Sequence, residues 1–181
     1  MQRKRALIID GYNVIRNNDC YQVEDQKDYS SEDIWNKARQ KLINDAGLHA
    51  NQSYERCVVV FDGAGNESSV GKPKVVAGVE VIFSPYKVSA DSVIERLAHD
   101  MREDGFEVVV VSSDAAIQTT VFGGGVSRMS ALGFGSASEI DKQELREQKR
   151  QINTHSSNIA SRINPNVAKK LHDFVRGNGQ L

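Results

Sequence analysis

The sequence predicts an α/β domain in which a mainly parallel central sheet is flanked by helices, with further helices at the C-terminal end. Two observations carry this prediction. Short runs rich in Val and Ile are typical of parallel strands that are buried on both faces. Segments with apolar residues at helical spacing lie between these runs, as expected when crossover helices connect parallel strands. The expected strands are Ala6–Ile9, Cys57–Phe61, Val79–Phe83 and Val108–Val111, with Val126–Met129 as one more short strand.

Three helices are expected between these strands. The first begins at a serine N-cap near Ser31, and the second begins at Ser89, because serine side chains accept hydrogen bonds from a helix's first N–H groups. A third, short helix is expected over Asp114–Phe122, where the glycines that follow end it. The glycine-rich stretch Gly63–Gly78 is expected to be a loop and a candidate for disorder.

The C-terminal part of the chain has a different pattern. Ser138 can cap a polar helix that runs from about Glu139 to Ile152, and the apolar-poor stretch Asn153–Ile163 is expected to be a loop. The last helix begins with Asn164 as N-cap and proline in the first turn. We therefore expect residues 1–135 to form the α/β domain and residues 136–181 to form a helical extension packed on or flanking it.

Composition narrows the possible functions. The chain has 181 residues and a formal net charge of −1, and no apolar run approaches the ~20 residues of a membrane helix. The apolar run after the basic N-terminus is shorter than the roughly 7–15 residues of a signal-peptide core. Cys20 and Cys57 have no metal-ligand spacing, so two free thiols in a reducing cytoplasm are expected, with no membrane partner.

Positive charge is concentrated near the C-terminus. From Lys149 onward the chain has six basic residues and one acid, Asp173, which gives this segment a formal charge of +5. Such segregation is consistent with a polyanionic partner, and equally with a solvated helix face.

Acidic residues follow each of the four longer predicted strands. Parallel strands bring their carboxyl ends to one edge of the sheet, where ligands bind in open α/β folds. Grouped carboxylates repel one another unless a cation neutralises them, and Mg²⁺ or Mn²⁺ prefers such oxygen ligands. Singly, each acid could instead be an N-cap, a turn residue or an exposed helix residue. The acids are Asp10, Asp62, Asp91 and Asp114, with Glu95 one helical turn after Asp91.

Several other classes of site lack their motifs. The first strand is not followed by Gly-x-Gly-x-x-Gly, and there is no phosphate-binding Gly-Lys-Ser/Thr loop, so no nucleotide cofactor is expected. Asp-x-Asp, His-Glu-x-x-His and Gly-x-Ser-x-Gly are also absent. The four histidines are expected to be solvated helix or loop residues.

Three segments, IIDGYNVI, SADSVIERLA and VVVVSSDAAIQ, together resemble the NYN-domain ribonucleases, and most closely the YacP-like subgroup, which includes ribosome-associated endoribonucleases. The resemblance extends from about Ala6 to Gly133, and GVSRMSALGF and the last helix also resemble this subgroup. The resemblance implies a PIN-like three-layer fold and a metal-dependent endoribonuclease that cleaves single-stranded RNA. The expected partners are mRNA and the ribosome.

The resemblance also implies roles for individual residues. Asp10, Asp91 and Asp114 match the family's acids and would hold Mg²⁺ or Mn²⁺, with Glu95 as a further ligand or general base. Asn13, Asp62 and Ser113 are expected to support them, and Tyr12 either packs beneath the site or stacks on a base. The alternative function is a non-catalytic RNA- or ribosome-binding module. The candidate RNA-binding residues, all on predicted loops or element ends, are Arg16, Lys72, Lys74, Lys87 and Arg128.

Overall fold

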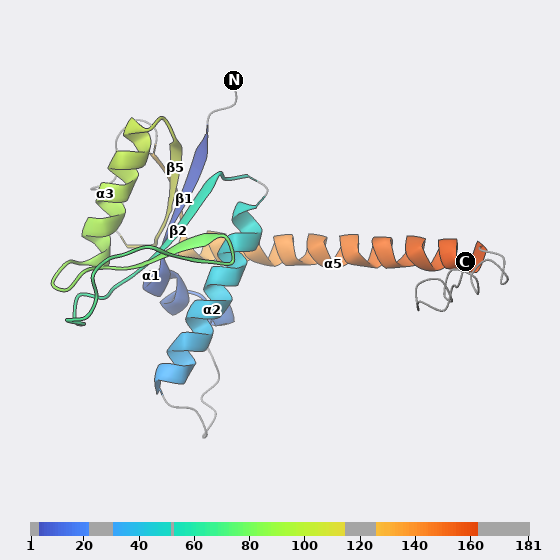
Figure 1. The fold of residues 1–181 in the computed structure, drawn as a ribbon, viewed down its shortest axis with the longest axis horizontal. Coiled ribbons are helices and arrows are strands. Elements are labelled where there is room, and N and C mark those ends of the chain that lie inside the picture. The colour runs from blue at the N-terminus through green and yellow to red at the C-terminus, as the bar shows by residue number, and fades with distance from the viewer. Residues whose placement is uncertain (1–3, 22–30, 52, 115–125, 163–181) are drawn as a thin grey trace, which may run out of the picture. The chain divides into compact units, whose positions relative to one another are not determined.

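A computed structural model shows a six-stranded sheet with the strand order β3-β4-β2-β1-β5-β6 (Figure 1). Neighbouring strands are parallel except for β3, which pairs antiparallel with β4 at one edge. The predicted α/β class and the mainly parallel sheet are therefore confirmed. The residues that the structure describes are 4–21, 31–51, 53–114 and 126–162.

All five predicted strands are present. One strand was missed, because β3 lies within the glycine-rich stretch that sequence patterns assigned to a loop and a candidate for disorder. Its three residues are exposed or half-buried, so they lack the apolar run that marks the other strands. The strands are β1 (Arg5–Asp10), β2 (Arg56–Phe61), β3 (Lys74–Val76), β4 (Val79–Phe83), β5 (Glu107–Val111) and β6 (Val126–Met129).

Of the three helices predicted between the strands, the two that the structure describes are confirmed, and they cover opposite faces of the sheet. Helix α2 (Ser31–Ala50) contacts β2 and β4, and its buried Leu42 belongs to the same core cluster as Leu7 and Ile9 of β1. Helix α3 (Ala90–Glu103) contacts β1, β2 and β5, and its Ile94 packs in a second cluster with the alternate residues of the same strands. The sheet is therefore the middle of three layers, and its central strands are buried on both faces.

Two short helical segments were not predicted from the sequence. Helix α1 (Gly11–Arg16) follows β1 without an intervening loop, and a 3₁₀ turn covers Asp19–Tyr21. The six-residue α1 is too short to show an apolar periodicity. The side chain of Asp10 caps it, so the acid that ends the strand also begins the helix.

The C-terminal prediction was wrong in two respects. Helix α5 begins at Ala131, where Ser130 Oγ accepts a hydrogen bond from the N–H of Gly133, and Ser138 is a buried residue inside it rather than its cap. The helix then continues to Arg162, through the stretch that was expected to be a loop. No glycine or proline occurs between Gly135 and that end, so the polar sequence contains nothing that breaks a helix.

The chain divides into two compact units, Met1–Asp141 and Lys142–Leu181. Within the first unit, Nδ1 of His49 on α2 lies 2.7 Å from Oδ2 of Asp141 on α5, and the His49 ring packs edge-on against Phe134. His49 is thus a largely buried, paired residue instead of the solvated one expected.

Other predicted features have different outcomes. Both cysteines are free thiols, and burial raises the pKa of Cys57 to about 12, as expected for a core residue. No helix in the described ranges is long and apolar enough to cross a membrane. The third helix expected between the strands (114–122), the glycines at 123–125 and the last helix from Asn164 fall, apart from Asp114, outside the described residues.

Candidate active site

Asp10 ends the central strand β1, and only 8% of the residue is exposed. Its Oδ1 accepts a hydrogen bond from the N–H of Asn13 at 3.2 Å, and Ser112 Oγ donates to its Oδ2 at 3.3 Å. The pKa of Asp10 is raised to about 6, mainly by burial and then by the negative charges of Asp91 and Asp114, although the two hydrogen bonds act in the opposite direction. A carboxylate is thus held where ionisation is costly.

The neighbouring acids come from three other elements. Asp91 lies exposed in the first turn of α3, and its pKa is raised by partial burial and then by the charges of Asp114 and Asp62. Asp62 follows β2, and its Oδ1 accepts hydrogen bonds from the N–H of Ala64 and, at 3.3 Å, from Ser84 Oγ. The strand register explains this convergence, because Asp10 stands beside Val60, two residues before Asp62. Four acids distant in the sequence therefore share one electrostatic environment.

Glu95 is placed less centrally than the sequence suggested. It lies one turn after Asp91 on α3 and is exposed, and it is not among the charges that raise the pKa of Asp10 or Asp91. In the part of the chain that the structure describes, no three His, Cys, Asp or Glu side chains lie close enough together, as they stand, to hold a metal ion.

Serine and asparagine side chains hold the β1 and β5 ends together. Oδ1 of Asn13 accepts a hydrogen bond from the N–H of Ser113 at 2.8 Å, and Ser113 Oγ accepts one from the N–H of Ala131 at 3.0 Å. Oγ of Ser112, besides bonding Asp10, accepts from the N–H of Asp114 at 3.1 Å. The side chains of Asn13 and Ser113 therefore bond backbone groups. The Asp10 carboxylate is contacted directly by the N–H of Asn13 and by Ser112, which was not predicted as a supporting residue.

The five basic candidates occupy separate places around this edge. Arg16 ends α1, Lys72 and Lys74 lie on and beside β3, and Arg128 is on the edge strand β6; all are exposed. Lys87 has a left-handed backbone conformation, with φ of 64°, and its Nζ lies 4.9 Å from the centre of the Tyr86 ring. The structure does not gather these residues into one cluster with the acids.

Tyr12 is packed, which is one of the two roles expected for it from the sequence. Its ring lies 5.3 Å from that of Trp35 and 5.1 Å from that of Phe61, measured between centroids, and Arg39 Nη1 donates to its hydroxyl at 2.7 Å. Trp35 and Arg39 were not predicted from the sequence, because both lie on α2, outside the three segments that carry the resemblance. The chain's single tryptophan was the one signal available.

Comparison with known proteins places this architecture in a family. A model of the YacP-like NYN domain matches residues 7–176. The chain belongs to the YacP-like NYN family. The NYN fold is of the nuclease kind, so family membership identifies a nuclease-type enzyme. Nucleases of this kind generally use divalent metals and act on RNA.

Relatives of known sequence and structure agree with this assignment. The chain is 29% identical to YacP of Bacillus subtilis (strain 168), described as an uncharacterized protein, over 171 residues that cover 94% of this chain and 96% of the relative. It is similar to the crystal structure of Rae1 (YacP) from the same organism, with a TM-score of 0.66, 26% identity and coverage of 96% and 95% of the two chains. A point-mutant structure of that protein matches with a TM-score of 0.63, 28% identity and coverage of 83% and 84%.

Proposed function

We propose that this NYN-family protein is a divalent-metal-dependent endoribonuclease that cleaves single-stranded RNA at the carboxyl edge of its sheet. The observation that carries the proposal is Asp10, a buried carboxylate whose pKa is raised to about 6 at the end of the central strand, beside the charges of Asp91 and Asp114. Purely structural carboxylates are normally paired with cations or left in water, because burial together with like charges is costly. Such an arrangement is favoured where a bound cation neutralises it.

The donor set suits Mg²⁺ or Mn²⁺. Mg²⁺ is bound by one or two carboxylates, with waters and substrate phosphates as its other ligands, so a protein site need not contain three converging acids. Asp10, Asp91 and Asp114 would supply these carboxylates. When bound, the cation supplies Lewis-acid stabilisation of the phosphate charge and lowers the pKa of water.

The protein's own residues orient the reaction. Asp10 is fixed by Asn13 and Ser112, so its carboxylate keeps one position as RNA arrives. Glu95, exposed one turn after Asp91, would accept a proton from the attacking water. Water adds to the phosphorus atom and the bond to the 3′ oxygen breaks, which leaves a 3′-hydroxyl and a 5′-phosphate. The exposed cations Arg16, Lys72, Lys74, Lys87 and Arg128 would contact the RNA backbone.

The physiological substrate is proposed to be mRNA, with cleavage aided by recruitment to the ribosome. This part of the proposal is supported by the formal charge of +5 from Lys149 onward and by the resemblance to ribosome-associated endoribonucleases. A cytoplasmic location is part of this proposal, and it agrees with the two free thiols.

Cleavage of a labelled single-stranded RNA in Mg²⁺ or Mn²⁺ tests the proposal. Asp10→Asn should remove cleavage, because the amide keeps the N-cap of α1 but cannot supply the charge. Asp100→Asn is the matched control, since Asp100 is an exposed acid nine residues further along α3 than Asp91. An Asp10→Asn protein that cleaves at the wild-type rate would contradict the mechanism.

A further inference from the structure

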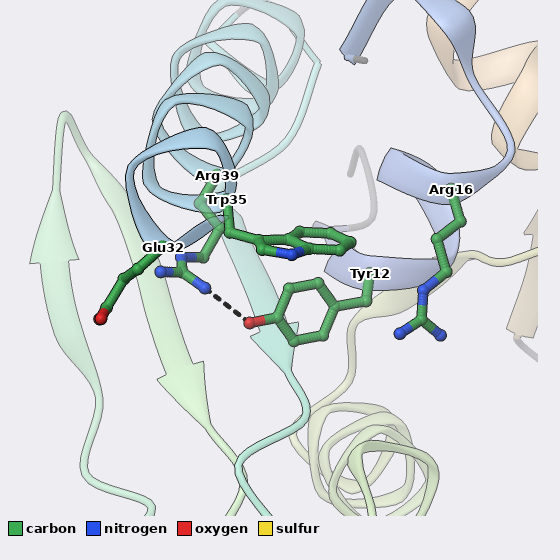
Figure 2. A pocket seen from close by; sticks show the side chains of 5 residues that line it. All are labelled: Tyr12, Arg16, Glu32, Trp35 and Arg39. Carbon is green, nitrogen blue, oxygen red and sulfur yellow. Dashed lines mark hydrogen bonds between the residues drawn. The ribbon is translucent and has the colours of Figure 1, made fainter. Parts of the chain in front are cut away.

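A pocket of about 480 Å³ lies between α1 and α2, and one of its lining residues, Tyr12, is two residues after Asp10 in the chain. Figure 2 shows its five lining side chains, which come from the two helices. The volume of the pocket is within the range of pockets that hold small ligands. The lining residues are Tyr12 and Arg16 of α1 and Glu32, Trp35 and Arg39 of α2.

The aromatic walls of this pocket are held in place by the protein. The rings of Tyr12 and Trp35 meet edge to face, with an interplanar angle of 84°. Tyr12 is fixed from behind by the buried Phe61 and at its hydroxyl by Arg39, whose other terminal nitrogen donates to Asn36 Oδ1 at 2.5 Å. Both rings are only half-buried, so part of each aromatic surface is available to a ligand.

The charge of the pocket favours an anion. Arg16 is exposed, with its guanidinium 5.8 Å from the Tyr12 ring centre. In Figure 2 it lies on the opposite side of Tyr12 from Arg39. Among the described residues Arg16 forms no hydrogen bond or ion pair, so its N–H donors can bind a phosphate bidentately. The one lining acid, Glu32, has its carboxylate directed away from Tyr12 in Figure 2.

The position of the pocket relates it to the acids. Asp10 and Tyr12 are two residues apart, so their Cα atoms are at most about 7 Å apart. An extended RNA strand with one phosphate at Asp10 can therefore reach the pocket with its neighbouring nucleotide. Aromatic faces accept any base by stacking, and arginines bind the backbone, which is the common chemistry of single-strand recognition.

We propose that this pocket binds one nucleotide of single-stranded RNA next to the cleaved phosphodiester, with its base on Trp35 and its phosphate on Arg16. The proposal rests on the endoribonuclease function proposed above. Arg39 is a positioning residue in this arrangement, because it acts through the hydroxyl of Tyr12.

Trp35 is the only tryptophan in the chain, so its fluorescence reports on this pocket alone. The probe is a 2′-O-methyl single-stranded oligonucleotide added in EDTA, so that binding is measured without cleavage. We expect the oligonucleotide to quench Trp35 fluorescence in the wild-type protein and to do so equally in Asp100→Asn.

Affinity is measured in parallel from the fluorescence anisotropy of a labelled oligonucleotide. Arg16→Gln and Trp35→Leu should each weaken binding at least fivefold, and Trp35→Phe should retain most of it because a stacking ring remains. Arg102→Gln, the same charge change at the opposite end of α3 from Asp91, should bind as the wild type does.

Two results would overturn the proposal, and only the second of them would also overturn the proposed nuclease function. RNA that binds by anisotropy without changing Trp35 fluorescence, and binds Arg16→Gln as tightly as wild type, would exclude the pocket and leave the nuclease function standing. A wild-type protein that neither binds nor cleaves single-stranded RNA would exclude both the pocket and the proposed function.

Discussion

Asp10 combines two roles that impose opposite demands on one side chain. As the N-cap of α1 it stabilises the fold by accepting the N–H of Asn13. As a buried acid beside Asp91 and Asp114 it destabilises the fold whenever it is ionised. The residue is therefore better explained by the proposed metal site than by its contribution to stability.

The raised pKa of Asp10 predicts how stability depends on pH in the metal-free protein. The unfolded chain loses this proton near pH 3.8 and the folded chain near pH 6, so between these values the folded state holds more proton. The free energy of unfolding should fall as pH rises through this window, by up to about 3 kcal/mol. Asp10→Asn should remove this dependence and be the more stable protein at pH 7.5.

Thermal unfolding in EDTA at pH 4 and pH 7.5 measures the effect. Asp100→Asn should keep the wild-type pH dependence, because Asp100 is exposed on α3. If Asp10→Asn and wild type lost the same stability between the two pH values, the prediction that burial raises the pKa of Asp10 would be wrong.

At the level of elements, the junction between β1 and α1 depends on Gly11. A Cβ atom at this position would lie 2.3 Å from the Phe61 ring of β2, and that ring is fully buried and packed against Tyr12 and Phe83. The absence of a side chain at Gly11 lets α1 begin directly at the sheet edge, which is what places Tyr12 beside Asp10.

Gly11→Ala should therefore destabilise the protein, although alanine favours helix by up to about 1 kcal/mol. Overpacking against a ring that cannot move should dominate, with a net loss of about 1–3 kcal/mol measured by urea unfolding. Gly65→Ala is the control, since nothing lies within 4 Å of the Cβ that it would add. Equal stability of Gly11→Ala and wild type would show that Phe61 has room to shift.

The elements also show what sequence patterns can and cannot predict. Strands such as β2 and β5 are marked by buried Val runs, and α3 by its Ser89 cap and apolar stripe, so all were predictable. The edge strand β3 has no run of buried residues, so it forms through its pairing with β4 and was not predictable from its own sequence. Helix α5 crosses a polar stretch that contains no helix-breaking residue, so the helix continues where a loop was expected. Convergence of the acids followed from strand polarity, whereas the Ser112 bond to Asp10 depended on the register of β1 and β5.

For the whole molecule, the first unit, Met1–Asp141, contains the acids and the pocket, and the basic segment from Lys149 onward lies in the second. Removing residues 164–181 deletes three of the six cations of that segment. Ribosome co-sedimentation should weaken, most clearly at raised salt, because phosphate contacts are salt-dependent. The truncated protein should cleave free RNA as the full chain does. Unaltered co-sedimentation would contradict a role of these residues in ribosome binding and would favour the alternative that the basic segment is a solvated surface.

In the proposed mechanism, the carboxylates at the sheet edge bind a divalent metal for RNA cleavage. This is tested by calorimetry of Mn²⁺ binding, with an uncleavable oligonucleotide present to supply phosphate ligands. Asp91→Asn is the informative variant, because Asp91 is exposed in the first turn of α3 and its amide should leave the fold intact. Wild type and Asp100→Asn should bind Mn²⁺, and Asp91→Asn should lose at least tenfold in affinity. Equal Mn²⁺ binding by wild type and Asp91→Asn, or none by wild type, would contradict the claim.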